Sequence, residues 1–341
     1  MKDKGWYPMQ DDLNFKPPWW LRNKHVQSVY ASLIPKQSAI KIRWEEMNLS
    51  DGDFIDLAWA GPIDAPIVIL LHGVEGSLKS HYIQEMLENL VSRGWQVVVM
   101  HYRGCSGRIN RLPQFYNAGD TTGDLKALVD MLHTRHPHLP LFAIGFSLGG
   151  NVLMRHLALN TDSPLVAGVG VSMPYELGKS SDYLIPFYQR IILRSLKRKF
   201  ELKFEAGIEM PVSRDHFRNM TTLRQFDSIV SVPMFDYNSV DEYYEDVSNR
   251  HLLQKINHPT LIFHAMDDPF VPQNSVPTAK ELSENTQFEI SENGGHMGFL
   301  RGGLPWRPTY WLTQKIQDFF AERAGVSFFP DQEEGEQQVA I

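Results

Sequence analysis

The feature that most restricts the fold of this chain is a regular alternation of short apolar runs with longer amphipathic stretches. The apolar runs have the length and composition of strands buried inside a sheet. They occupy residues 67–71, 95–102, 141–146, 165–173, 260–265 and 286–291. The amphipathic stretches have helical spacing and occupy residues 81–93, 121–135, 148–159, 276–284 and 308–322. Strands that alternate with helices predict an α/β fold with right-handed crossovers.

Two further strands precede this alternation, and one long segment interrupts it. Residues 39–60 are typical of two strands around a turn at 50–53, which brings the expected, mostly parallel sheet to eight strands. Residues 175–250 are rich in aromatic and charged residues and contain no clear buried strand. Because the strand pattern resumes afterwards, we expect one α/β domain over residues 39–323, flanked by helices, with a helical cap inserted at about 175–250.

The two ends of the sequence lie outside this pattern. We expect residues 1–38 to form an N-terminal arm that packs on the domain. Residues 324–341 are acidic and poor in apolar side chains, a composition that favours disorder.

Composition and charge narrow the functional classes. The 341 residues carry a net charge of −7 and the pI is about 6.0, so a nucleic-acid partner is not expected. The single cysteine, Cys105, excludes an intrachain disulfide and fits a reducing compartment. No signal-peptide pattern and no apolar stretch of membrane-spanning length occur. We therefore expect a soluble, cytoplasmic protein, and the sequence leaves its oligomeric state open.

Two segments raise the alternative of weak association with a membrane surface, because aromatic and basic side chains gather at lipid interfaces. They are Trp19-Trp20 and the basic run at 197–200. We favour the other interpretation, in which the tryptophans pack the N-terminal arm onto the domain and the lysines face solvent. Stable membrane insertion is not expected.

The motif with the clearest chemical meaning is the segment 145–149, GFSLG, which has the form G-x-S-x-G. It follows an expected buried strand and opens an expected helix, which is the context of a nucleophile elbow. Such a turn exposes the serine hydroxyl at a helix N-terminus, where the helix dipole favours developing negative charge. Ser147 is therefore the candidate nucleophile.

A serine nucleophile needs a general base that is itself held by a third group. After a nucleophile elbow these partners follow in the chain order acid, then histidine. Asp267 and Asp268 come directly after the strand at 260–265. We choose Asp268, which precedes a proline-fixed turn, and Asp267 remains the alternative. His296 lies on a glycine-rich loop after the last strand, so the predicted triad is Ser147, Asp268 and His296.

Acyl transfer also needs hydrogen-bond donors for the developing oxyanion. One donor is expected to be the backbone N–H of Leu148, which follows the nucleophile. The other is expected to be the N–H of Val74, in the loop after the strand at 67–71. His72, in the same loop, is expected to be a buried, hydrogen-bonded residue. No histidine cluster here has carboxylate partners, so neither a metal site nor a cofactor is expected.

The order of these motifs resembles that of the α/β-hydrolase superfamily, and within it the YheT-type bacterial hydrolases. The resemblance rests on PPWWL at 17–21, HVQSVY at 25–30, HGVEGS at 72–77, YRGCSG at 102–107, GFSLGGN at 145–151 and DDPFVP at 267–272. The wider family includes plant embryogenesis-associated proteins, yeast medium-chain ethyl ester synthases and mammalian membrane-attached lipases. The resemblance places the same three residues in the triad and implies hydrolysis of esters with short to medium acyl chains.

We therefore expect a serine carboxylic ester hydrolase that acts on a small-molecule ester through an acyl-enzyme intermediate. The inserted segment is expected to form a lid and the acyl pocket. Its aromatic candidates for lining that pocket are Tyr175, Tyr183, Phe187, Tyr188, Phe235 and Tyr237. Two alternatives stay open: an alcohol acceptor could replace water and give ester synthesis, or the fold could serve as a non-catalytic binding protein.

Overall fold

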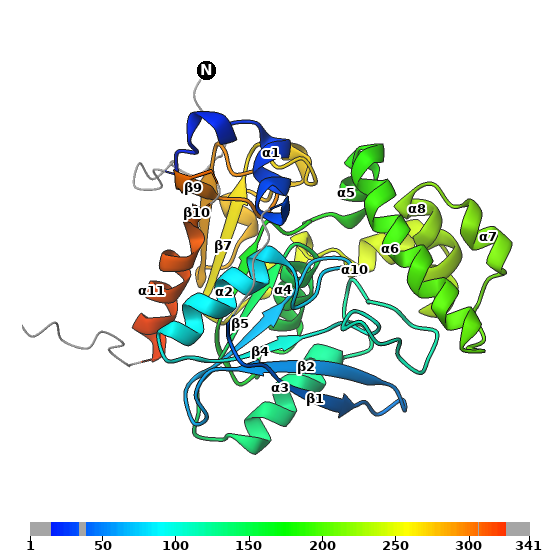
Figure 1. The fold of residues 1–341 in the computed structure, drawn as a ribbon, viewed down its shortest axis with the longest axis horizontal. Helices are drawn as coiled ribbons and strands as arrows, with labels where there is room; N and C mark the ends of the chain where they lie inside the picture. Colours follow the sequence, from blue (N-terminus) through cyan, green and yellow to red (C-terminus); the bar gives the residue numbers. More distant parts are fainter. Residues whose placement is uncertain (1–14, 34–38, 306, 325–341) are drawn as a thin grey trace, which may run out of the picture.

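The computed structural model describes residues 15–33, 39–305 and 307–324 (Figure 1). Residues 1–14 and 34–38 of the N-terminal arm, and residues 325–341 of the acidic tail, lie outside this description. The predictions made for those residues are therefore left as they stand.

A single eight-stranded sheet forms the centre of the molecule, with the strand order β1-β2-β4-β3-β5-β6-β7-β8. Its strands are β1 (Arg43–Asn48), β2 (Phe54–Ala60), β3 (Ile67–Leu71), β4 (Gln96–Met100), β5 (Leu141–Phe146), β6 (Leu165–Val171), β7 (Thr260–Ala265) and β8 (Thr286–Ser291). β1 and β2 run antiparallel to their neighbours, and the strands from β4 to β8 are parallel. The sheet is the mostly parallel, eight-stranded one that the sequence predicts.

Helices cover both faces of this sheet (Figure 1). α2 (His81–Ser92) and α11 (Leu312–Ala324) pack side by side on one face, and α3 (Asp124–Arg135) and α4 (Leu148–Leu159) on the other. The alternation of side chains along each strand explains the two layers. In β3, Val68 and Leu70 join the core under α2 and α11, whereas Ile67, Ile69 and Leu71 join the core under α3 and α4.

A helical segment is inserted between β6 and β7 and stands to one side of the sheet (Figure 1). Its helices are α5 (Leu177–Tyr183), α6 (Pro186–Glu205), α7 (Arg214–Asn219), α8 (Leu223–Phe226), α9 (Val232–Met234) and α10 (Val240–Val247). A π-helical turn at Asp227–Ser231 joins α8 to α9. The buried side chains of this segment, which we call the cap, are continuous with the core on the α3–α4 face.

Two predicted helices differ from the structure. Residues 276–284 form no α-helix; the chain makes 3-10 turns at Gln273–Ser275 and Ala279–Glu281. Pro277 explains this result, because the residue before a proline is pushed out of the helical region, and Val276 is extended with ψ of 128°. The last helix begins only at Leu312, because β10 (Arg307–Tyr310) first pairs with β9 (Leu300–Leu304) in a separate two-stranded sheet.

The described part of the N-terminal arm contacts the domain through specific side chains. Phe15 packs against the rings of Phe299 and Trp311 at 5.5 and 5.6 Å. The prediction that both tryptophans pack is wrong for Trp19, which is 80% exposed, whereas Trp20 contacts another aromatic ring of the arm. Within the described residues, no helix combines the length and apolarity needed to cross a bilayer.

Candidate active site

The turn between β5 and α4 holds Ser147 in a strained backbone conformation. Its φ is 50° and its ψ is −117°, a region that residues other than glycine rarely occupy. Flanking glycines permit the turn: a Cβ on Gly145 would lie 2.2 Å from the carbonyl oxygen of Gly149. The backbone N–H of Ser147 donates to the carbonyl oxygen of Val171 at 2.8 Å. The hydroxyl is therefore presented at the N-terminus of α4, as the sequence predicts for an elbow.

Three predicted residues come together at the carboxyl ends of the parallel strands. Ser147 follows β5, Asp268 follows β7 and His296 follows β8. The Nε2 atom of His296 lies 2.9 Å from Ser147 Oγ. Its Nδ1 atom lies 2.8 and 3.1 Å from the two carboxylate oxygens of Asp268. All three residues are buried, with exposed fractions of 7% or less. This arrangement can pass a proton from the hydroxyl to the imidazole while the carboxylate holds the ring.

Neighbouring groups fix the orientation of the imidazole and the carboxylate. Phe270 donates its backbone N–H to Asp268 Oδ1 at 2.7 Å. The ring of Phe270 stacks on the ring of His296, with 4.0 Å between centroids and 8° between planes. One carboxylate oxygen of Asp268 therefore accepts a hydrogen bond from the backbone. The stacked ring of Phe270 restricts rotation of the imidazole.

The rival aspartate has a different place. Asp267 accepts a hydrogen bond from the backbone N–H of Gly295 at 2.9 Å and does not contact the imidazole. Burial raises its pKa, and the nearby charge of Asp268 adds to that rise. Asp267 thus holds the loop that carries His296, whereas Asp268 contacts His296 itself.

The N-terminal arm also supports this loop, which the sequence did not indicate. The backbone N–H of His296 donates to the hydroxyl of Ser28 at 2.8 Å. A Cβ on Gly295 would lie 2.6 Å from the carbonyl oxygen of Lys24, so α1 (Lys24–Val29) and the loop are closely packed. Ser28 belongs to the HVQSVY segment, which is part of the resemblance to YheT-type hydrolases. That resemblance was the only sequence signal that pointed to Ser28.

The two predicted oxyanion donors line the same cavity as the triad. In the described part of the chain, neither Val74 nor Leu148 donates its backbone N–H to a protein acceptor, and the first amides of a helix have no partner within it. The adjacent Gly73 is anchored, because its N–H donates to the hydroxyl of Tyr82 at 2.9 Å. A Cβ on Gly73 would lie 3.2 Å from Ser147 Cβ. The loop is thus held directly against Ser147.

His72 is buried and hydrogen-bonded, as the sequence predicts. Its Nδ1 lies 2.7 Å from the carbonyl oxygen of Gly73, and its Nε2 accepts from the backbone N–H of Tyr102. Burial lowers the pKa of His72 to about 3, so the ring is neutral at physiological pH and shapes the loop without titrating.

A largely buried ion pair links the cap to the loop after β3, residues 72–77. Lys199, on α6, donates to a carboxylate oxygen of Glu75 at 2.8 Å and to Cys105 Sγ at 2.9 Å. Glu75 follows Val74 directly and has a positive φ of 56°. These contacts correct the expectation that the lysines of the run at 197–200 face solvent, because the side chain of Lys199 is only 15% exposed.

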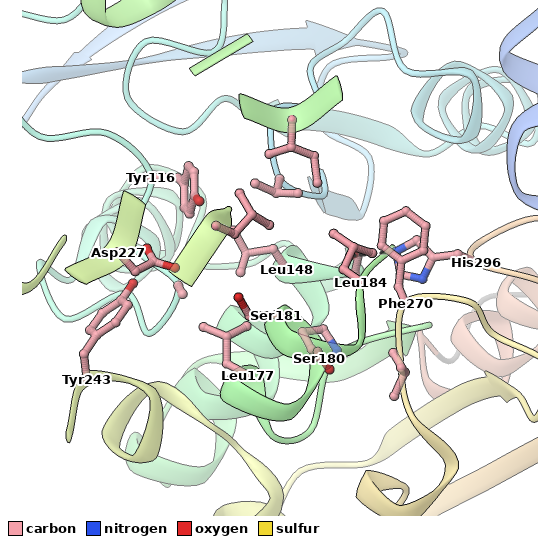
Figure 2. A pocket seen from close by; sticks show the side chains of 17 residues that line it. Tyr116, Leu148, Leu177, Ser180, Ser181, Leu184, Asp227, Tyr243, Phe270 and His296 are labelled. Carbon is pink, nitrogen blue, oxygen red and sulfur yellow. Dashed lines mark hydrogen bonds between the residues drawn. The ribbon is translucent and has the colours of Figure 1, made fainter. Parts of the chain in front are cut away.

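A cavity of about 80 Å³ lies beside the triad and is lined by both the sheet edge and the cap. Figure 2 shows its lining, with Leu148, Leu177 and Leu184 between His296 at one end and Asp227 at the other. The six cap aromatics proposed from the sequence do not line it; the aromatic residues that do are Tyr116, Tyr243 and Phe270. Tyr175, for example, is directed elsewhere and packs against His264 and Phe288. Among the described residues, no group of three or more His, Cys, Asp or Glu side chains could hold a metal ion.

Comparisons with known proteins agree with this architecture. The family model described as "alpha/beta hydrolase fold" matches residues 66–302. The protein named "Putative esterase YheT" of Escherichia coli K12 is 36% identical over 315 residues, covering 89% of this chain and 92% of that protein. The mouse protein named "Phospholipase ABHD3" is 30% identical over 316 residues, covering 87% of this chain and 75% of that protein.

Solved structures show the same fold at lower sequence identity. An esterase of Pyrococcus furiosus, Pf2001, superimposes with a TM-score of 0.56 and is 17% identical, covering 86% of this chain and 98% of that one. At this identity the likeness supports the fold alone. The family model and the sequence relatives carry the assignment: this chain belongs to the α/β-hydrolase fold family, in its YheT-like group of esterase- and lipase-type hydrolases.

Proposed function

We propose that this hydrolase is a serine carboxylic ester hydrolase that works through an acyl-enzyme intermediate. The single observation that carries the proposal is the unbroken hydrogen-bonded series Ser147–His296–Asp268 at the wall of a buried cavity. A serine hydroxyl is a poor nucleophile until a positioned base removes its proton. The distances of 2.9 and 2.8 Å are within the range that proton transfer and ring orientation require.

In the first step, Ser147 Oγ attacks the ester carbonyl carbon while His296 Nε2 takes the hydroxyl proton. Asp268 accepts a hydrogen bond from Nδ1–H, which fixes the tautomer and stabilises the imidazolium that forms. The carbonyl oxygen becomes an oxyanion and receives hydrogen bonds from the N–H groups of Leu148 and Val74. Collapse of this intermediate breaks the ester C–O bond, and His296 returns its proton to the departing alkoxide.

In the second step, a water molecule attacks the acyl carbon of the serine ester. His296 removes a proton from the water, the same two amides stabilise the second oxyanion, and the proton then passes to Ser147 Oγ as the acid is released. Every proton that leaves an oxygen is returned, so the cycle needs neither a metal ion nor a cofactor.

The cavity favours small acyl groups. Its volume is about 80 Å³, whereas an apolar cavity of roughly 150 Å³ holds a benzene molecule. Leu148, Leu177 and Leu184 give it apolar walls, which match a hydrocarbon chain of short to medium length.

Turnover of p-nitrophenyl acetate and butyrate by the wild type and by Ser147→Ala tests the proposal. Loss of the nucleophile is expected to lower kcat by several orders of magnitude, on the order of 10⁴-fold or more. Ser92→Ala serves as the matched control, because Ser92 lies at the exposed end of α2, away from the site, where its hydroxyl donates to the carbonyl oxygen of Asn89. Equal rates in the wild type and Ser147→Ala would contradict the proposal.

A further inference from the structure

The cavity beside the triad has one polar end that the proposed ester hydrolysis does not use. Asp227 and Tyr243 line it at the end away from His296 and Phe270, and Tyr116 lies nearby (Figure 2). Asp227 is 6% exposed and Tyr243 is fully buried. Burying a carboxylate and a phenol beside an apolar channel is costly unless both are hydrogen-bonded, so the partners of these two groups are informative.

The direction of the cavity identifies which part of an ester would reach this end. The leaving oxygen has to lie close to His296 Nε2, because that atom returns the proton to it. Figure 2 places Asp227 and Tyr243 beyond Leu148 and Leu177, on the side of the cavity away from His296. The group that extends toward them is therefore the acyl chain, and its far terminus meets the two polar side chains.

Asp227 is held by the cap but keeps acceptor capacity. Ser231 donates its hydroxyl to Oδ1 at 2.7 Å, and Tyr244 donates its hydroxyl to Oδ2 at 2.8 Å. Each carboxylate oxygen has a second lone pair. Asp227 opens a π-helical turn between α8 and α9, a distortion that occurs frequently at functional sites. Burial raises the pKa of Asp227 to about 6.

Tyr243 contributes an unused donor. Its hydroxyl lies near Ser231 and the backbone of Ala118 but makes no hydrogen bond of acceptable geometry to any described residue. A buried hydroxyl without a partner costs about 1–3 kcal/mol. A ligand group that accepts from Tyr243 and donates to Asp227 would satisfy both side chains at once.

We propose that Asp227 and Tyr243 form a terminal subsite of the acyl pocket that selects acyl chains ending in a hydroxyl group. This inference rests on the proposed function, because it requires an acyl group attached through Ser147. A terminal hydroxyl donates its hydrogen to Asp227 and accepts one from Tyr243, so it matches both groups. A terminal carboxylate would be repelled by Asp227. A terminal ammonium has no lone pair with which to accept a hydrogen bond from Tyr243.

Paired substrates test the subsite. We would measure kcat/KM for p-nitrophenyl esters of straight-chain acids of roughly three to six carbons, each with and without a terminal hydroxyl. The wild type is expected to prefer the hydroxylated ester at one chain length at least. Asp227→Asn and Tyr243→Phe are each expected to lower the ratio of the two kcat/KM values by about tenfold at that length.

A second aspartate–tyrosine pair of the cap provides the matched control. Tyr237 donates its hydroxyl to Asp246 at 2.6 Å, and neither residue lines the cavity. Tyr237→Phe and Asp246→Asn make the same chemical changes and are expected to leave the ratio unchanged. Thermal unfolding of all four variants shows whether each is folded, and the ratio compares two substrates on the same variant, so a general loss of folded protein cancels.

The outcomes separate this inference from the proposed function. If Ser147→Ala is inactive but the wild type prefers the plain ester at every chain length, the terminal subsite is wrong and the serine mechanism stands. An unchanged ratio in both Asp227→Asn and Tyr243→Phe has the same meaning. If Ser147→Ala turns over both esters like the wild type, the proposed function itself fails. A lower ratio confined to the two cavity variants supports the subsite.

Discussion

Ser147 shows how one strained residue is maintained by its surroundings. A non-glycine residue at φ of 50° costs about 1–3 kcal/mol, and the surrounding structure has to impose it. Here the backbone bond to Val171 and the contact between Gly145 and Gly149 leave no room for a relaxed turn. The result is a hydroxyl that projects from the sheet edge, with Nε2 of His296, the proposed base, 2.9 Å away.

The two adjacent aspartates differ sharply in their expected effect on catalysis. Asp268→Asn removes the carboxylate that holds Nδ1–H, so the imidazole no longer keeps the tautomer that can accept the serine proton. We expect kcat to fall by roughly 10³- to 10⁴-fold. Asp267→Asn keeps an oxygen that can accept from Gly295, and its kcat is expected to fall less than about tenfold. Steady-state kinetics on p-nitrophenyl butyrate measures both.

The control is built into this pair, because the two variants make the same substitution one residue apart. Equal losses, or a larger loss in Asp267→Asn, would contradict the assignment of Asp268 as the residue that orients His296.

Asp227 is expected to make folding depend on pH in a defined window. Burial raises its pKa to about 6 in the folded protein, above the value of about 3.9 in an unfolded chain. The unfolded state therefore releases this proton first as pH rises. The free energy of unfolding that Asp227 contributes is present below pH of about 4 and is lost as pH rises to about 6.

Asp227→Asn removes that titration while keeping an oxygen that can accept from Ser231. Relative to the wild type, the variant is expected to gain about 1–3 kcal/mol of stability between pH 4 and pH 7. Urea unfolding at both pH values measures the difference. If the free energy of unfolding changes equally in the wild type and in Asp227→Asn between the two pH values, the pKa of this carboxyl is not raised in the folded protein.

At the scale of elements, α6 is the part of the cap that reaches the loop after β3, in which Val74 is the proposed oxyanion donor. Its Lys199 is 15% exposed at the side chain and its partner Glu75 is 5% exposed. Removing one member of a buried ion pair leaves the other charge without compensation. Since Glu75 is bonded directly to Val74 in the chain, its displacement would also move the proposed oxyanion donor.

Lys199→Met is accordingly expected to lower kcat by about tenfold and to change KM less, because the oxyanion donors act in the transition state. Lys197→Met is the matched control on the same helix; Lys197 donates to the backbone oxygens of Arg218 and Met220, away from the site. A Lys199→Met enzyme with a normal kcat and only a raised KM would indicate that Lys199 serves substrate binding alone.

The strands of the sheet could be predicted because each buried strand is a local run of apolar residues in the sequence. The predicted bounds are correct for β5, α4, β7 and β8. β5 and β7 are buried on both faces, and β8 is the neighbour of β7 at the edge of the sheet. The β9–β10 hairpin lacked such a run: Gly302 and Pro308 interrupt the pattern, and its pairing depends on contacts distant in sequence.

The cap was harder to predict in detail than the sheet. Its helical character followed from composition, but which aromatic residues face the cavity depends on how its helices dock on the sheet. Tyr243 was missed although it is only a few residues from Tyr237, which was proposed as a lining residue. Asp227 was missed because a π-helical turn changes the direction of side chains relative to a regular helix.

At the scale of the whole molecule, three parts that are distant in sequence meet at one edge of the sheet. The loops after the strands supply the three residues of the proposed triad, the cap supplies about half of the residues that line the cavity, and α1 supports the loop that carries His296. Gln27 strengthens this support, because its side chain donates to the carbonyl oxygen of Leu300 and accepts from the N–H of the same residue.

Ser28→Ala tests whether the arm contributes to catalysis from this position. The loss of the acceptor for the backbone N–H of His296 is expected to lower kcat by about three- to tenfold, since a hydrogen bond of this kind contributes about 1 kcal/mol. Ser32→Ala is the control, because the Ser32 hydroxyl bonds only the nearby carbonyl oxygen of Val29. Equal kinetics in Ser28→Ala and Ser32→Ala would show that the arm is not required for catalysis.

The measurement that tests the central claim most directly is site-resolved labelling with a fluorophosphonate, which reacts with an activated serine. Mass spectrometry of the labelled wild type is expected to find one adduct, on Ser147, formed in step with the loss of esterase activity. His296→Ala, which lacks the base, is expected to label far more slowly. An adduct on another residue, or esterase activity that survives complete labelling of Ser147, would contradict the account.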